Sequence, residues 1–216
     1  MVNWMQKMLV FVAFGDSLTV GFQYPTPFSL WIEETPYTDF LQAKVEDLLG
    51  RLGQSVSFDI HFYNKGINGD LTSNMLLRFK RDVIELKPKP NSVIVLGGSN
   101  DIGWEVPTEE IFNNLKKMYV HARDNAIEPI ACTVPSVFGL DSYIPPRLEL
   151  NRLLREYCVQ NELTCVDLFR ATSDPNTNRL LEEFSNDGLH LTTEGYQKIA
   201  ETIHSEAIEK IINKLI

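Results

Sequence analysis

The sequence predicts an α/β protein in which a five-stranded, mainly parallel sheet lies between two layers of helices. Short apolar runs typical of buried strands alternate along the 216 residues with segments of helical hydrophobic spacing. Parallel strands require such crossover connections, and no linker or repeat interrupts the alternation. We therefore expect a three-layer α/β/α sandwich that forms a single domain over residues 1–216.

Five segments have the pattern of strands. The first is a compact apolar run that stops at Gly15, and the third is fully apolar and stops at Gly97. In the second, apolar residues alternate with polar ones, so we expect this strand near an edge of the sheet with one wetter face. The five expected strands span residues 8–14, 56–62, 93–96, 129–134 and 164–169.

Helical spacing of apolar residues predicts the elements between these strands. Gly50 offers a C-terminal stop for the first helix, and Thr108 is expected to cap the N-terminus of the third. The segments 21–36 and 136–146 are rich in proline or aromatic residues and are expected to be irregular. The expected helices span approximately residues 37–49, 71–86, 108–122, 150–158 and 193–211.

The net charge of −9 limits the classes of partner. Such a surface repels phosphate backbones and anionic membranes, so we expect no nucleic-acid partner. No stretch approaches the roughly 18 apolar residues of a membrane helix. The apolar start, Met1–Phe14, runs straight into Gly15 without a small-residue cleavage site, so we expect a cytoplasmic protein without a signal peptide and, by default, a monomer.

Nothing in the sequence predicts a metal or cofactor. The three cysteines, Cys132, Cys158 and Cys165, form no C-x-x-C pair and are interpreted as buried apolar side chains. There is no phosphate-binding glycine motif. Asp174 starts a segment like a calcium loop, but Arg179 occupies its glycine position.

Polar segments that contain glycine follow the expected strands, and the candidate reacting groups lie in these segments. They are residues 15–18, 64–70, 97–101 and 187–190. In an open parallel sheet, such segments meet beyond the carboxyl ends of the strands, where binding sites form. The topology therefore brings them together at one edge of the sheet.

These segments contain the groups that acyl transfer needs. A serine such as Ser17 becomes nucleophilic when a base removes its proton, and the imidazole of His190 suits that task. Asp187, three residues before His190, can orient the ring. The backbone N–H groups of Ser17 and Gly69 and the amide of Asn100 can stabilise an oxyanion. Asp16 is interpreted as a structural turn or capping residue, and Asp101 as a structural or supporting carboxylate.

The same segments give the chain a family resemblance. Gly15-Asp16-Ser17-Leu18 resembles the nucleophile block of the SGNH hydrolases, also called GDSL-type esterases and lipases, and Asp187-Gly188-Leu189-His190 resembles their acid–base block. Gly69 and Asn100 match the oxyanion-hole glycine and asparagine. All four blocks occur in family order between Phe11 and about Ala200. The sequence departs from the pattern at Leu191, where proline is frequent.

The resemblance implies the flavodoxin-like fold of these hydrolases. It also implies a carboxylic ester hydrolase that acts on small acyl or aryl esters, or on lipids, without a cofactor. Two alternatives stay open: a carbohydrate O-deacetylase of the same family, and a catalytically silent relative that binds sugars or lipids. The expected catalytic residues are Ser17, Asp187 and His190, with Ser17, Gly69 and Asn100 in the oxyanion hole. His61, His121 and His204 are expected to be surface or core histidines.

The sequence defines the residues of the substrate pocket less closely than the catalytic residues. Several aromatic residues flank the expected site, and they can line an acyl pocket. Phe22 and Trp104 can equally serve loop packing or a dimer contact, whereas Phe138 and Tyr143 belong to the segment 136–146, another candidate pocket wall. The pocket candidates are Phe22, Trp104, Phe138 and Tyr143.

Overall fold

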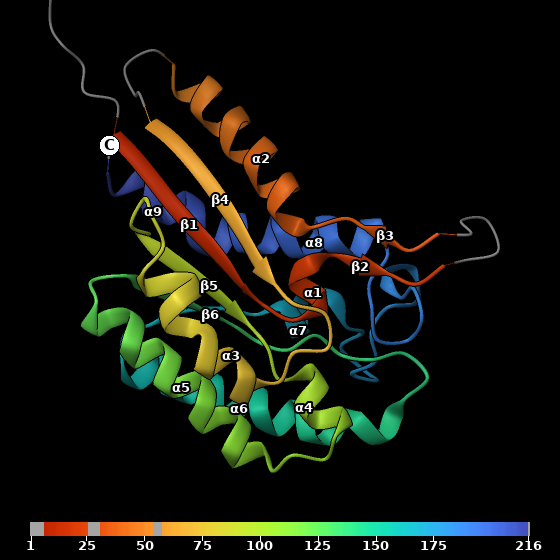
Figure 1. The fold of residues 1–216 in the computed structure, drawn as a ribbon. Helices are drawn as coiled ribbons and strands as arrows, with labels where there is room; N and C mark the ends of the chain where they lie inside the picture. The colour runs from red at the N-terminus through yellow and green to blue at the C-terminus, as the bar shows by residue number, and fades with distance from the viewer. Residues whose placement is uncertain (1–6, 26–30, 54–57, 216) are drawn as a thin grey trace, which may run out of the picture.

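A computed structural model describes residues 7–25, 31–53 and 58–215 of the chain. Figure 1 shows its helices and strands in three layers. The strands are β1 (Lys7–Gly15), β2 (Phe22–Gln23), β3 (Glu33–Glu34), β4 (Phe58–Gly66), β5 (Ser92–Leu96), β6 (Glu128–Cys132) and β7 (Thr164–Val166). The longer helices are α2 (Tyr37–Leu52), α3 (Thr72–Phe79), α5 (Thr108–Asp124), α6 (Ile144–Gln160) and α8 (Thr193–Ile203).

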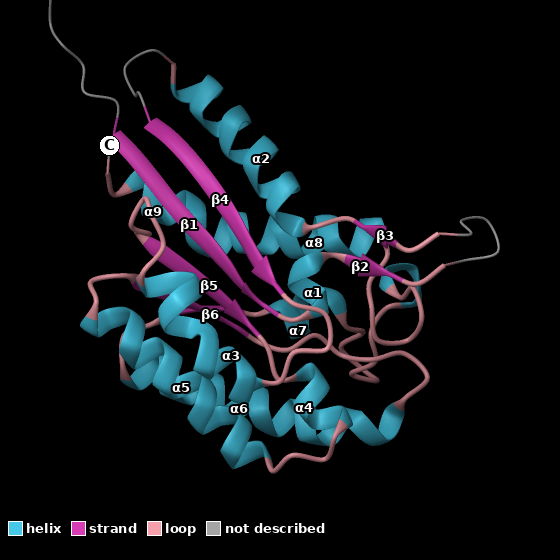
Figure 2. Cartoon of the chain, viewed as in Figure 1, coloured by secondary structure: helices cyan, strands magenta, loops and turns pink. Residues whose placement is uncertain are grey.

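The described residues form a five-stranded, wholly parallel sheet in the order β4-β1-β5-β6-β7. The prediction of a parallel sheet is confirmed, and so is the edge position of the second predicted strand, β4. Residues 56 and 57 of that predicted strand lie outside the described residues. β2 and β3 form a separate antiparallel pair beyond the main sheet (Figure 2).

Alternation along β1 divides the core in two. Leu9, Phe11 and Ala13 pack on one face of the sheet, and Val12 and Phe14 pack on the other, as the period of two in a strand requires. The first face is covered by α2, α8 and the C-terminal α9 (Glu209–Asn213), and the second by α3, α5 and α6 (Figure 1). Both faces being covered explains why the central strands are apolar throughout.

Short helices at the carboxyl ends of the strands were not predicted. They are α1 (Ser17–Val20), α4 (Ser99–Gly103), α7 (Leu168–Thr172) and the 3₁₀ turns Asp141–Tyr143 and Glu182–Phe184. α7 corrects the predicted strand over 164–169, because the strand ends at Val166. The carboxylate of Asp167 accepts a hydrogen bond from the backbone N–H of Arg170, and this N-cap turns the apolar continuation into a helix.

Three helix boundaries also differ from prediction. Gly50 does not end the first predicted helix, because α2 continues to Leu52 and Gly53 follows as its C-cap with a φ of 75°. Thr108 is the first residue of α5 rather than its cap, and Pro107 precedes it with extended backbone. α6 starts at Ile144, inside the loop predicted over 136–146, because proline is tolerated in the first helical turn. The predicted helices over 71–86 and 193–211 continue through π-helical turns at Lys80–Ile84 and His204–Ile208.

Candidate active site

Ser17 begins the short helix α1 directly after β1. The carboxylate of Asp16 caps this helix by accepting a hydrogen bond from the backbone N–H of Leu18 at 2.9 Å. Gly15 is required before it, since a Cβ there would lie 2.1 Å from the carbonyl oxygen of Leu96 on the neighbouring strand. The tight turn leaves Ser17 only 5% exposed at the carboxyl edge of the sheet.

Asp16 is itself fully buried. Burial raises the pKa of its carboxyl from 3.8 to about 7, against the lowering effects of the hydrogen bond from Leu18 and of nearby His190. Its Oδ2 atom has no hydrogen-bond partner among the described residues. Asp16 therefore serves as the helix cap predicted from the sequence. Its burial favours the protonated, neutral form of its carboxyl.

Asp187 and His190 lie in the loop before α8. His190 Nδ1 is 2.8 Å from Asp187 Oδ2, and the backbone N–H groups of Leu189 and His190 donate to Asp187 Oδ1. Burial alone would raise the pKa of Asp187, but these hydrogen bonds outweigh it and lower the pKa to about 2. Because the carboxylate is ionised, it accepts from Nδ1–H and leaves Nε2 of the neutral ring free to accept a proton.

That free nitrogen faces the serine. His190 Nε2 lies 3.0 Å from Ser17 Oγ, within hydrogen-bonding distance. Gly188 keeps the loop in place with a left-handed φ of 97°, and a Cβ at this position would lie 2.7 Å from the carbonyl oxygen of Phe138. The structure thus brings Ser17, His190 and Asp187 into one chain of hydrogen bonds.

Gly69 and Asn100 lie beside this chain. One small cavity, with a volume of about 170 Å³, is lined by Ser17, Phe22, Asn68, Gly69, Asn100 and His190. The side-chain amide of Asn100 donates to the carbonyl oxygen of Asp70 at 3.0 Å, which fixes its orientation and leaves its second N–H available. Gly69 has a φ of 73°, in the left-handed region that favours glycine. All five expected site residues therefore meet.

Sequence reasoning missed the buried arginine that connects these segments. Arg78 donates to Asp70 Oδ2 at 2.7 Å, to the carbonyl oxygen of Gly15 at 2.9 Å and to that of Lys65 at 2.9 Å. It also donates to Asp82 Oδ2 at 3.1 Å. One guanidinium thus joins the end of β1, the end of β4 and the loop that carries Gly69. A helical pattern around an arginine usually indicates a surface position, so no sequence signal marked it.

Asp101 supports the same region from α4. Both of its carboxylate oxygens accept hydrogen bonds from the backbone N–H of Thr72, at 3.0 and 3.1 Å, and this fixes α4 against the start of α3. Burial raises the pKa of Asp101, while the hydrogen bonds from Thr72 act in the opposite direction. The carboxylate lies next to Asn100 in sequence and serves a supporting role, as expected.

The pocket candidates divide between two cavities. Phe22 lines the catalytic cavity, and its ring centroid is 4.6 Å from that of His190. Trp104 and Tyr143 line an adjoining cavity of about 260 Å³, which also includes Asn100. Phe138 is among the lining residues of neither; instead its backbone N–H donates to the carbonyl oxygen of Gly188 at 2.9 Å. The structure therefore places Phe138 outside both cavities, with its backbone bonded to the loop that carries His190.

The strand β2 was missed because the sequence around it is irregular. Its residues are bonded to the histidine-bearing region: Tyr196 donates its hydroxyl to the carbonyl oxygen of Phe22 at 2.7 Å. The amide of Gln23 donates to Thr193 Oγ1 at 3.1 Å, and the backbone N–H of Tyr24 donates to Asn186 Oδ1 at 2.6 Å. β2 consequently forms one wall of the site.

The other three histidines lie elsewhere. His61 pairs with Asp59 on the edge strand β4 at 2.9 Å, and His121 is exposed on α5. His204 is buried, and burial lowers its pKa. Within the described part of the chain, no group of three or more histidine, cysteine or acidic side chains could hold a metal ion. None of its helices is long and apolar enough to cross a membrane.

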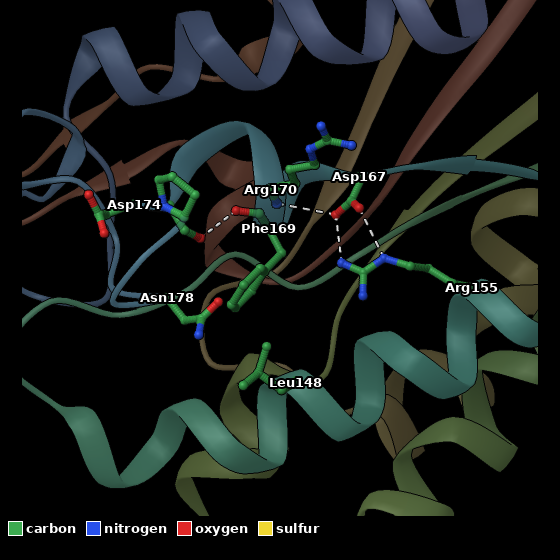
Figure 3. A pocket seen from close by; sticks show the side chains of 9 residues that line it. Leu148, Arg155, Asp167, Phe169, Arg170, Asp174 and Asn178 are labelled. Atoms are coloured by element: carbon green, nitrogen blue, oxygen red, sulfur yellow. Dashed lines mark hydrogen bonds and ion pairs between the residues drawn. The ribbon is translucent and has the colours of Figure 1, made fainter.

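A larger cavity, with a volume of about 610 Å³, lies away from these residues between α6, α7 and the loop that follows α7. Figure 3 shows Leu148 and Phe169 facing each other across it. Three of its four charged groups have partners within the protein: Arg155 binds both oxygens of Asp167 at 2.9 Å, and Asp174 accepts from backbone N–H groups of its own loop. Size alone therefore does not identify the functional site.

The fold and the site together define a class of protein. It is a three-layer α/β protein in which hydrogen bonds join a serine, a histidine and an aspartate at the carboxyl edge of a parallel sheet. The model of the GDSL-like lipase/acylhydrolase family matches residues 13–198. The chain belongs to this family, and the resemblance stated from the four sequence blocks is confirmed.

Individual relatives are more distant. The chain is 28% identical over 143 residues to an N-acylneuraminate cytidylyltransferase of Streptococcus agalactiae, a match that covers 65% of this chain and 33% of the relative. It is 30% identical over 135 residues to the lipoprotein YqeF of Bacillus subtilis, covering 59% of this chain and 49% of that protein. The chain thus corresponds to only a third to a half of these relatives.

Solved structures share the fold. A lipase/acylhydrolase of Enterococcus faecalis superposes with a TM-score of 0.74 at 23% identity, covering 94% of this chain and 97% of that one. A variant of the acetyl xylan esterase Axe2 of Geobacillus stearothermophilus superposes with a TM-score of 0.72 at 20% identity, covering 93% and 94%. At these identities, the similarity shows a common architecture.

Proposed function

We propose that the chain is a serine esterase that hydrolyses small carboxylic esters through an acyl-enzyme on Ser17. The observation that carries this proposal is the chain of two hydrogen bonds from Asp187 through His190 to Ser17, at 2.8 and 3.0 Å. The arrangement has the geometry of a nucleophile with its general base and orienting carboxylate. Membership of an acylhydrolase family supports the reaction class.

Acylation starts when Ser17 Oγ attacks the ester carbonyl carbon while His190 Nε2 accepts the serine proton. The ionised Asp187 stabilises the imidazolium that forms. The negative charge on the tetrahedral intermediate accepts hydrogen bonds from the backbone N–H groups of Ser17 and Gly69 and from the second N–H of Asn100. The intermediate collapses as the carbon–oxygen bond to the alcohol breaks, and His190 gives its proton to the departing oxygen.

Deacylation repeats these steps with water. His190 takes a proton from a water molecule, whose oxygen attacks the acyl-enzyme carbonyl carbon. The second tetrahedral intermediate uses the same oxyanion donors. When it collapses, the proton returns from His190 to Ser17 Oγ, and the carboxylic acid is released.

The substrate is proposed to have a short acyl group. The cavity around Ser17 measures about 170 Å³ and is bounded by Phe22, which suits an acetyl or similarly small group rather than a long chain. Acetyl esters of carbohydrates are the second candidate, because the acetyl xylan esterase Axe2 shares the fold and a relative is named for N-acylneuraminate, a sugar derivative.

The experiment measures kcat/KM for 4-nitrophenyl esters of increasing acyl length and for acetylated sugars. We expect hydrolysis to be fastest for acetyl esters and to fall more than about 10³-fold in both Ser17→Ala and His190→Ala. Ser205→Ala and His61→Ala, at exposed positions away from the site, serve as matched controls and should retain activity. Undiminished hydrolysis in Ser17→Ala would overturn the proposal, and the panel decides between aryl and sugar acetates.

A further inference from the structure

The cavity next to the catalytic one contains a buried cation. This adjoining cavity, of about 260 Å³, is lined by Asn100 and Leu189, neighbours of the catalytic groups, and by Trp104, Tyr143 and Arg147. Asn100 lines both cavities, so a substituent of an ester held at Ser17 can extend into the second one. Trp104, which is 77% exposed, stands at the surface of this space.

Arg147 has hydrogen-bond partners but no counter-ion among the described residues. It is 2% exposed, and it donates to the carbonyl oxygens of Pro135 and Tyr143 and to Ser99 Oγ, at 3.2, 3.1 and 2.9 Å. No described carboxylate forms an ion pair with it, and no acidic residue lines the cavity. The other buried arginine, Arg78, is by contrast paired with two carboxylates.

A buried charge without a counter-ion is costly, so an anion that enters the cavity has a strong electrostatic advantage. Burial lowers the pKa of Arg147 to about 10, against the raising effect of the Asp16 carboxyl, which is near but forms no ion pair with it, and the guanidinium stays charged at neutral pH. A guanidinium has five N–H donors, and the three hydrogen bonds to Pro135, Tyr143 and Ser99 leave two of them for a ligand. Its planar fork suits a carboxylate better than a neutral group.

We propose that this adjoining cavity is a subsite for a carboxylate carried by the ester substrate, with Arg147 as the group that recognises it. The inference rests on the proposed esterase function of Ser17 and adds a substrate class to it: esters that bear an acidic substituent on the alcohol or on the acyl group. The indole of Trp104 covers the apolar part of that substituent at the mouth of the cavity.

The test compares matched esters in the wild-type enzyme. On the alcohol side, 3-acetoxybenzoate is compared with 3-acetoxybenzamide; on the acyl side, the 4-nitrophenyl monoester of glutaric acid is compared with the ester of its monoamide. We expect kcat/KM to favour the acid over the amide by at least about tenfold in one of the two pairs, as charge-assisted hydrogen bonds predict. Equal values in both pairs would overturn the proposal.

Variants on α6 test whether Arg147 causes the preference for the acid over the amide. Arg147→Met should bring the acid-to-amide ratio close to one, whereas Arg152→Met, on the same helix but exposed and paired with Glu149 and Glu156, should leave it unchanged. Trp104→Ala should lower kcat/KM for both members of a pair. Because Trp104 is exposed, Trp104→Ala provides a second test of the cavity if Arg147→Met does not fold. An unchanged ratio in a folded Arg147→Met would contradict the assignment.

Binding separates this proposal from the catalytic one. Titration calorimetry with 3-acetamidobenzoate, an amide analogue of the acetoxy ester, measures the subsite without requiring hydrolysis. Tighter binding of this acid than of 3-acetamidobenzamide, in a protein whose Ser17 proves unreactive, would support the subsite and reject the esterase. Equal binding in a protein that hydrolyses neutral acetates would reject the subsite alone.

Discussion

His190 Nε2 and Ser17 Oγ lie 3.0 Å apart although 173 positions separate the two residues in the sequence. Ser17 is positioned by the end of β1, and His190 by the loop before α8, in which Asn186 is hydrogen-bonded to the backbone of Tyr24, directly after β2. The pair therefore forms only when the N-terminal and C-terminal parts of the chain are both in place. Substitutions of residues that join separate segments therefore test the site as directly as substitutions of the reacting groups.

Asn100→Ala is expected to reduce kcat by about 10²-fold or more with little change in KM, because the amide acts on the oxyanion and not on the ground-state ester. Its side chain also donates to the carbonyl oxygen of Asp70, so circular dichroism should establish that the variant folds. Steady-state kinetics on 4-nitrophenyl acetate provides the measurement. A loss confined to KM would be inconsistent with an oxyanion role.

Arg78→Met is expected to lower the free energy of unfolding by roughly 3–5 kcal/mol, since Asp70 would remain buried without its partner. Arg81→Met is the matched control, because Arg81 also pairs with Asp82 but is exposed, and its loss should leave stability nearly unchanged. Urea unfolding of the two variants measures the difference. Equal stability of both variants would contradict the role assigned to the buried guanidinium.

Asp16→Asn is expected to change how stability depends on pH. Burial raises the pKa of Asp16 in the folded protein to about 7, above its value of 3.8 in the unfolded chain, so folding favours the protonated carboxyl. Its contribution to stability is complete below about pH 4 and is lost as the pH rises to about 7. Asparagine mimics the neutral form and can still accept from the N–H of Leu18.

The variant should therefore gain stability relative to wild type as the pH rises through this window, by a total on the order of 4 kcal/mol. Urea unfolding at intervals from pH 4 to pH 8 measures this difference, and other titrating groups cancel in the comparison. A difference that stays constant across the window would show that Asp16 does not change its protonation state there.

The sequence predicted the central strands and most helices because both faces of this sheet are covered, which makes the strands apolar and gives each helix one apolar side. It predicted Ser17, Gly69, Asn100, Asp187 and His190 because each lies just beyond a strand or just before a helix, where parallel topology places functional groups. These patterns are local in the sequence, so they can be recognised without knowledge of the tertiary contacts.

What the sequence did not predict depends on long-range contacts. Arg78 reaches the carbonyl oxygen of Gly15, 63 positions away, and Arg147 reaches Ser99, 48 positions away; both look like ordinary helix-surface residues until the helices are packed. β2 is only two residues long and is held by hydrogen bonds to α8, so no periodicity marks it. The strand predicted through Phe169 failed because one side chain, Asp167, caps a helix.

The central claim is that Ser17 is a nucleophile activated by His190, and labelling with a fluorophosphonate probe tests it most directly. The account predicts that mass spectrometry of the folded protein finds one adduct, on Ser17, and that the adduct forms far more slowly in His190→Ala and not at all after denaturation. An unmodified Ser17 in the folded protein, or equal labelling rates with and without the imidazole, would contradict it.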